Sequence, residues 1–139
     1  MMKPTTLRDG WTVTDTSEKG VGDLVQSILR ASAPPVHHPE RRRHKRHALP
    51  RLVTLTPIDD QEMKQVDEPV VVVGKSLALR GFDFYHNEPL PYRRAVISFD
   101  EMPEAVHLVL LISWCRFLRP GWYDSGGRFT HIVRPDSPA

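Results

Sequence analysis

The stretch VVVVGKSLALRGFDFYH, residues 70–86, carries the clearest structural signal in the chain. Its four consecutive valines are β-branched and favour a strand. The segment GFDFYH that ends it is short, aromatic and nearly alternating, which predicts a second strand. Gly81 stands at the end of the polar bend between these strands, and we expect it to take the positive φ that glycine tolerates best. The stretch therefore predicts two strands joined by a bend.

Strand-like segments rich in β-branched or aromatic residues continue on both sides of this stretch. Pro and Gly turns separate them, such as RPG at 119–121. The four further predicted strands occupy residues 51–58, 93–100, 106–118 and 122–133. Six strands without alternating helices indicate an antiparallel barrel or sandwich, and closure into a barrel removes exposed strand edges. We therefore predict an all-β fold, a six-stranded antiparallel barrel.

The predicted strand 106–118 is long and apolar, and its alternate residues point to one face. That face carries Val106, Leu108, Leu110, Ile112 and Trp114. We expect Cys115 to be a small buried side chain, because no histidine is placed to activate it as a nucleophile. The aromatic residues Trp114, Trp122 and Tyr123 have two interpretations: packing in the core or at the barrel rim, which we favour, and stacking on a base.

The first 39 residues differ from the rest, and we divide the chain into an N-terminal segment, 1–39, and a barrel domain, 40–139. Residues 1 to 15 show no periodicity. Residues 17–31 then place Val21, Leu24, Val25, Ile28 and Leu29 on one helical face, before the prolines at 34 and 35. The apolar stripe of this amphipathic helix packs on the barrel in the favoured interpretation; in the alternative it binds a partner.

Bulk composition excludes several classes of protein. The single cysteine allows neither an internal disulfide nor a thiolate zinc cluster. We find no apolar run long enough for a membrane span and no signal-peptide pattern, so a cytoplasmic protein is expected. No paired acid and base and no phosphate-cradling glycine motif is present, so we expect no enzyme activity.

Positive charge is concentrated just before the first predicted barrel strand, in the run RRRHKR at 41–46, although the net charge is only +2. Guanidinium groups bind phosphate oxygens bidentately and stack on purines. From charge alone three interpretations stay open: a solvated linker, a nucleic-acid arm, or a site for a small phosphate ligand. Nearby histidines suggest no metal site, because the surrounding cations would repel a metal ion.

Two of these features together resemble the PilZ family, bacterial receptors for cyclic di-GMP. That family carries R-x-x-x-R before its first barrel strand and [D/N]-x-S-x-x-G at the end of the second. Here Arg42 and Arg46 match the first motif, and Gly81 matches the glycine of the second. Ser76 stands at the Asp/Asn position and Ala78 at the Ser position, so the second motif is degenerate. The segments WCRF and GGRF are similar to the closing strands, and the resemblance covers about residues 40–133.

The resemblance implies a receptor that binds cyclic di-GMP, with no other cofactor and no catalytic residue. Arg42, Arg46, Ser76 and Gly81 are the expected ligand contacts, and Arg41 and Arg43 are expected as auxiliary ones. The arginine-rich segment would wrap the ligand and signal to an effector protein. Nucleic acid is not expected as a partner. The alternative is a degenerate barrel that binds no nucleotide and acts as a protein-interaction module, an alternative that Ala78 favours.

Overall fold

The structure is a computed structural model that describes residues 10–32, 46–100, 102 and 104–136. Its elements in chain order are β1 (Trp11–Asp15), α1 (Glu18–Ser32), β2 (His47–Ala48), β3 (Leu52–Ile58), β4 (Val70–Leu77), β5 (Gly81–His86), β6 (Arg94–Phe99), β7 (Val106–Arg119) and β8 (Trp122–Pro135). All six strands predicted from the sequence are present as β3 to β8.

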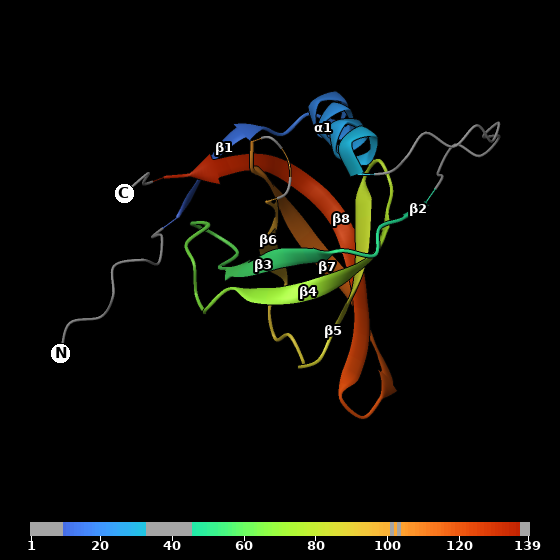
Figure 1. The fold of residues 1–139 in the computed structure, drawn as a ribbon. Helices are drawn as coiled ribbons and strands as arrows, with labels where there is room; N and C mark the ends of the chain where they lie inside the picture. The colour runs from blue at the N-terminus through green and yellow to red at the C-terminus, as the bar shows by residue number, and fades with distance from the viewer. Residues whose placement is uncertain (1–9, 33–45, 101, 103, 137–139) are drawn as a thin grey trace.

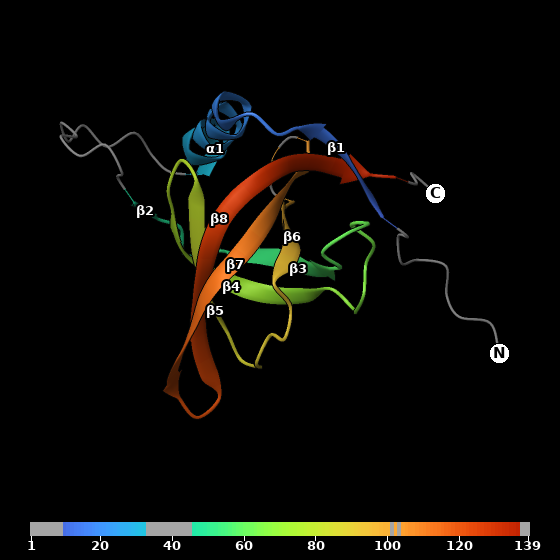
Figure 2. The same ribbon diagram turned by 180° about the vertical axis from the view of Figure 1, so that it is seen from behind.

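These six strands close into a barrel (Figure 1 and Figure 2). They pair in the order β8-β5-β4-β3-β6-β7, and β7 pairs again with β8 to complete the ring. Every pairing in the ring is antiparallel. Strand β1 is added to β8, and the short β2 pairs with β4. The predicted fold class, a six-stranded antiparallel barrel after one N-terminal helix, is confirmed.

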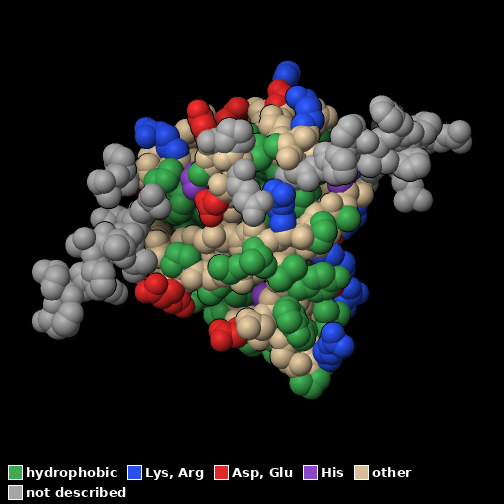
Figure 3. All heavy atoms as spheres, viewed as in Figure 1, with side chains coloured by type: hydrophobic (Ala, Val, Ile, Leu, Met, Phe, Trp, Pro, Cys, Tyr) green, Lys and Arg blue, Asp and Glu red, His purple; other side chains and the backbone are tan. Residues whose placement is uncertain are grey.

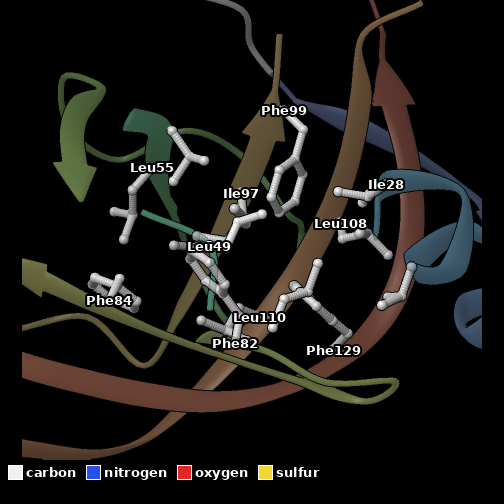
Figure 4. Close-up of a cluster of buried hydrophobic side chains, with 14 of the residues drawn as sticks. Ile28, Leu49, Leu55, Phe82, Phe84, Ile97, Phe99, Leu108, Leu110 and Phe129 are labelled. Atoms are coloured by element: carbon white, nitrogen blue, oxygen red, sulfur yellow. The ribbon is translucent and has the colours of Figure 1, made fainter. Parts of the chain in front are cut away.

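Aromatic side chains from three strands fill the barrel (Figure 4). The ring of Phe82 lies 5.6 Å from that of Phe84, 5.8 Å from Phe99 and 6.2 Å from Phe129, measured between ring centroids. Phe82 and Phe84 are buried because the alternation of β5 directs them inward. The same alternation directs Gly81 and Asp83 to the outer face, where the candidate site lies.

Helix α1 and strand β1 pack on the barrel. Helix α1 follows Ser17, whose hydroxyl accepts a hydrogen bond from the Gly20 amide at 3.0 Å and caps the first turn. Val21, Val25 and Ile28 are buried in the same cluster as the barrel core. The predicted helix and its packing are therefore confirmed. Residues 11–15 form β1, which the sequence did not predict, because this edge strand buries only Trp11 and lacks a clear alternation.

The β7–β8 hairpin extends beyond the barrel ring (Figure 1 and Figure 2). Pairing of β7 with β6 ends at Leu111, whereas β7 stays paired with β8 to Arg119. The predicted RPG turn closes the hairpin, with Gly121 at φ 85°. Residues 113–119 are exposed as a result.

Two predictions for β7 are wrong because of this extension. Cys115 is exposed, because the hairpin has left the core at that point. Val106, Leu108, Leu110 and Ile112 pack in the core cluster as predicted, but Trp114 does not. The register shifts between Ile112 and Trp114, and the bulge turns the indole to the outer face.

Candidate functional site

A hollow of about 240 Å³ opens on the outer face of β4, β5, β7 and β8. The bend between β4 and β5 forms one side of it, and the bulged part of β7 forms the other. Its lining residues are Arg46, Ser76, Ala78, Gly81, Asp83, Ser113, Trp114, Gly127 and Arg128. Three residues predicted from the sequence, Arg46, Ser76 and Gly81, therefore meet in one place. Arg41, Arg42 and Arg43 lie outside the described residues.

Cross-strand pairing explains why these side chains meet. Ser76 of β4 stands opposite Asp83 of β5, and Asp83 stands opposite Gly126 of β8. Gly126 in turn stands opposite Trp114 of β7. Directly opposed residues share a face of the sheet. These four residues therefore form one row on the outer face, which crosses β4, β5, β8 and β7. A bulge at Lys75, where the register of β4 shifts between Gly74 and Ser76, sets the position of Ser76 in that row.

Gly126 is small for a steric reason. A Cβ atom at this position would overlap the Asp83 carboxylate and come within 2.6 Å of the Trp114 ring. The missing side chain therefore lets the indole and the carboxylate approach each other across β8. Nothing in the sequence around Gly126 indicated this contact.

The backbone conformation of Gly81 differs from the one predicted. The described residues with positive φ are Met63 and Gly121, so the expectation of a left-handed Gly81 is wrong. Two backbone hydrogen bonds between Ala78 and Gly81, at 2.9 and 3.2 Å, close the turn through Leu79 and Arg80 instead. A Cβ on Gly81 would lie 2.9 Å from the Gly127 carbonyl oxygen. Glycine is therefore required for close approach of two backbones at the floor of the hollow.

Asp83 is the polar centre of the site, and the sequence analysis missed it. Its side chain is only 8% exposed, whereas that of Arg46 is 64% exposed. The guanidinium of Arg46 donates to Asp83 Oδ2, and the Ser76 hydroxyl donates to the same oxygen at 3.0 Å. A buried carboxylate needs such partners because burial without them is costly. The alternation of GFDFYH, with Asp83 between two inward phenylalanines, was the available signal.

Trp114 and Arg128 add a ring and a cation to the rim. Trp114 is 37% exposed, and the guanidinium of Arg116 lies 5.7 Å from the centroid of its ring. Trp114 and Trp122 are exposed, so neither packs in the core. Tyr123 packs against His86, with ring centroids 5.5 Å apart. The exposed indole can stack on a planar ring such as a base, and the two arginines beside it can bind an anionic group.

A second buried carboxylate, Asp124, lies next to the site on β8. Its side chain is 1% exposed and forms ion pairs with Lys75 at 3.0 Å and Arg116 at 2.9 Å. Burial acts to raise the pKa of Asp124, but the hydrogen bonds from Arg116 and Lys75 outweigh it and hold the pKa below its ordinary value. The carboxylates of this face are thus buried and paired, whereas Arg46 and Arg116 remain largely exposed.

Nearby, burial lowers the pKa of His86, although the Glu88 carbonyl and Asp124 act in the opposite direction. The imidazole bonds the Ser125 hydroxyl at 2.7 Å and so belongs to the packing under the hairpin. Within the described ranges no group of three or more His, Cys, Asp and Glu side chains is placed to hold a metal ion. In that same part of the chain no helix has the length and apolarity needed to cross a membrane.

Comparisons of this chain with protein-family models, with curated proteins and with solved structures found no match.

Proposed function

We propose that this chain is a cyclic di-GMP receptor of the PilZ type, a bacterial cytoplasmic regulator without catalytic activity. The observation that carries the proposal is the meeting of Arg46, Ser76 and Gly81 in one hollow. Arg46 belongs to one motif and Ser76 and Gly81 to the other, and the fold brings both motifs to the same hollow. Trp114 and Arg128 in the same hollow supply further chemistry that suits a nucleotide.

Each group has a role that its chemistry supports. Arg46 and Arg128 would bind phosphate oxygens, and the exposed face of Trp114 would stack on a guanine. The Asp83 carboxylate would accept hydrogen bonds from the N1–H and amino group on the guanine edge. Among the described residues, Arg46 and Ser76 donate to Asp83, both of them to Oδ2, and a carboxylate offers about four acceptor positions. Asp83 would thereby replace the acidic or amide side chain that the second motif lacks at Ser76.

The hollow fits one end of such a ligand. Pockets that enclose a whole ligand usually measure about 300–1,000 Å³, whereas this one measures about 240 Å³. One base with its phosphate would occupy it, and Arg42, four residues before Arg46, would cover the outer part with Arg41 and Arg43 as auxiliary contacts. Arg46 has five N–H donors, so it can hold a phosphate without releasing Asp83.

In sequence, the arginine run lies between helix α1 and the first part of the candidate site. Strand β2 follows Arg46 and pairs with β4 at Ala48 and Ser76, and α1 ends at Ser32 before the arginine run. Ligand binding by that run would therefore change the connection between α1 and the barrel. Such a change would pass the signal to an effector protein.

A second candidate function is a protein-interaction module that binds no nucleotide. Two observations favour it. Ala78 lines the hollow without a hydroxyl group, and Asp83 forms an ion pair with Arg46. In this alternative the Arg46–Asp83 pair would only attach the lead-in segment to the barrel.

Replacement of Ala78 by Ser tests the two candidates. In a receptor the new hydroxyl restores one motif contact, and affinity for cyclic di-GMP should rise about threefold to tenfold. An interaction module should show no binding in either form. We avoid Ser76→Asp, because a carboxylate there would face Asp83 and repel it. Steep salt dependence with no preference for the cyclic dinucleotide would instead indicate nucleic-acid binding.

A further inference from the structure

The end of the β7–β8 hairpin exposes large apolar side chains that the candidate site does not use. We define the hairpin tip as residues 116–122. In it Phe117 is 60% exposed, Leu118 42% and Trp122 40%. The tip projects past the ring as a two-stranded ribbon (Figure 1 and Figure 2), so these side chains lie away from the barrel core. Contiguous exposed apolar groups on a projecting element mark a contact surface.

The exposed charge of the tip is positive. Residues 113–123 contain Arg116 and Arg119 and no Asp or Glu. The first acidic residue after them, Asp124, is buried and paired with Arg116 and Lys75. Figure 3 shows hydrophobic side chains over the projecting hairpin and the strands above it, with Lys and Arg side chains along one side. The surface therefore combines apolar groups with cations.

A hollow of about 520 Å³ continues this surface onto the barrel wall. Val73, Tyr85, Leu118, Arg119 and Trp122 line it, which makes it largely apolar with one cation among its lining residues. Val73 stands opposite Tyr85 on one side and opposite Leu52, which is 62% exposed, on the other. The apolar surface thus extends from the tip across three strands.

We propose that the hairpin tip docks on the surface of an anionic lipid bilayer. Phe117, Leu118 and Trp122 would enter the interface between headgroups and acyl chains, where tryptophan is favoured. Arg116 and Arg119 would lie at the level of the lipid phosphates. A narrow ribbon can enter the interface without immersing the barrel, and its lack of exposed carboxylates removes repulsion from the lipid. The inference is independent of nucleotide binding.

Co-sedimentation of the full chain with lipid vesicles tests this inference. One set of vesicles contains phosphatidylcholine and phosphatidylglycerol in equal parts, and the other contains phosphatidylcholine alone. We expect binding to the anionic set, with a blue shift of tryptophan emission as Trp122 leaves water. Leu118→Asp, alone or with Phe117→Asp, should weaken binding about tenfold or more, because a charge resists entry into the interface.

Two further variants make the test specific. Arg119→Gln should reduce binding to the anionic vesicles, because Arg119 forms no ion pair within the described part of the chain and its charge would face the lipid phosphates. Val66→Asp changes an apolar residue of similar exposure, 47%, in the β3–β4 connection and should leave binding unchanged. Circular dichroism and melting curves confirm that each variant is folded.

Failure of the wild-type chain to bind the anionic vesicles would overturn the proposal. Equal binding of the wild type and the Leu118→Asp variant would do the same. A dimer in analytical ultracentrifugation that Leu118→Asp dissociates, without any vesicle binding, would assign the tip to a second copy of this chain instead.

Discussion

Arg46 and Asp83, which are 37 residues apart in the chain, form an ion pair on the outer face of β5. The arginine is mostly exposed and the carboxylate is almost fully buried. The pair therefore joins a largely exposed cation to a buried acceptor inside the hollow. It links the arginine motif before the barrel to the bend between β4 and β5.

Replacement of Asp83 by Asn tests whether the carboxylate accepts hydrogen bonds from a guanine. The amide keeps the size of the side chain but loses one acceptor and the charge. Because hydrogen bonds to a charged group contribute about 1.5–3 kcal/mol, affinity for cyclic di-GMP should fall at least about tenfold. Equilibrium titration of the variant measures this change.

Tighter binding by the Asp83→Asn variant would contradict the proposed role, because it would mean that Asp83 only restrains Arg46. Asp60→Asn serves as the control, since Asp60 is 48% exposed and its ion pairs among the described residues, with Arg93 at 3.9 Å and Arg94 at 3.7 Å, lie outside the hollow.

Replacement of Gly126 by Ala should both destabilise the protein and disturb the site. The added methyl would overlap the Asp83 carboxylate and the Trp114 ring, and overpacking of this kind typically costs about 1–3 kcal/mol. We expect a lower free energy of unfolding in urea and weaker ligand binding.

Gly22→Ala is the matched control for Gly126→Ala. Gly22 lies in α1, and a Cβ there would meet nothing within 4 Å. Alanine in a helix interior should stabilise the protein by about 0.5–1 kcal/mol. A Gly126→Ala variant as stable as the wild type would show that Trp114 does not pack over β8 as described.

Acidification should weaken the fold through Asp124. The pKa of Asp124 is lowered in the folded protein below its ordinary value of 3.8, so its contribution to stability is present above about that pH. That contribution is lost as the pH falls through the folded pKa, because the unfolded chain then binds the proton more readily. Unfolding free energies of the wild type should therefore fall more steeply below pH 3.8 than those of Asp124→Asn.

At neutral pH the Asp124→Asn variant should be less stable than the wild type by about 1–3 kcal/mol, because Lys75 and Arg116 lose a buried charged acceptor. Urea unfolding over a pH series measures both effects. Parallel pH profiles for the two proteins would contradict the ion-pair arrangement around Asp124.

The barrel was predictable because its strands carry strong local signals. The valines of 70–73, the alternation of 81–86 and the RPG turn each fix a local structure that the barrel keeps. Strand β1 was not predictable, since its pairing partner, β8, lies more than 100 residues away and its own five residues show little pattern. Only long-range pairing turns that segment into a strand.

The candidate site was predictable only in part. Motif spacing identified Arg46, Ser76 and Gly81. Trp114 lies at the site because of a bulge in β7, and no local sequence pattern predicts that bulge. The exposure of Cys115 has the same origin, because strand length alone does not tell where a hairpin leaves the barrel. Arg42 lies outside the described residues, so its part in the site stays a prediction.

Calorimetric titration with cyclic di-GMP at near-physiological salt tests the central claim most directly. The wild type should bind saturably with a Kd in the micromolar range or tighter, and Arg46→Ala and Arg42→Ala should abolish the signal. Arg93→Ala, which removes a 74%-exposed arginine outside the hollow, should bind like the wild type. No heat at high ligand concentration, together with an unchanged Tm, would contradict the proposal of a cyclic di-GMP receptor. The protein-interaction module would then be the favoured function.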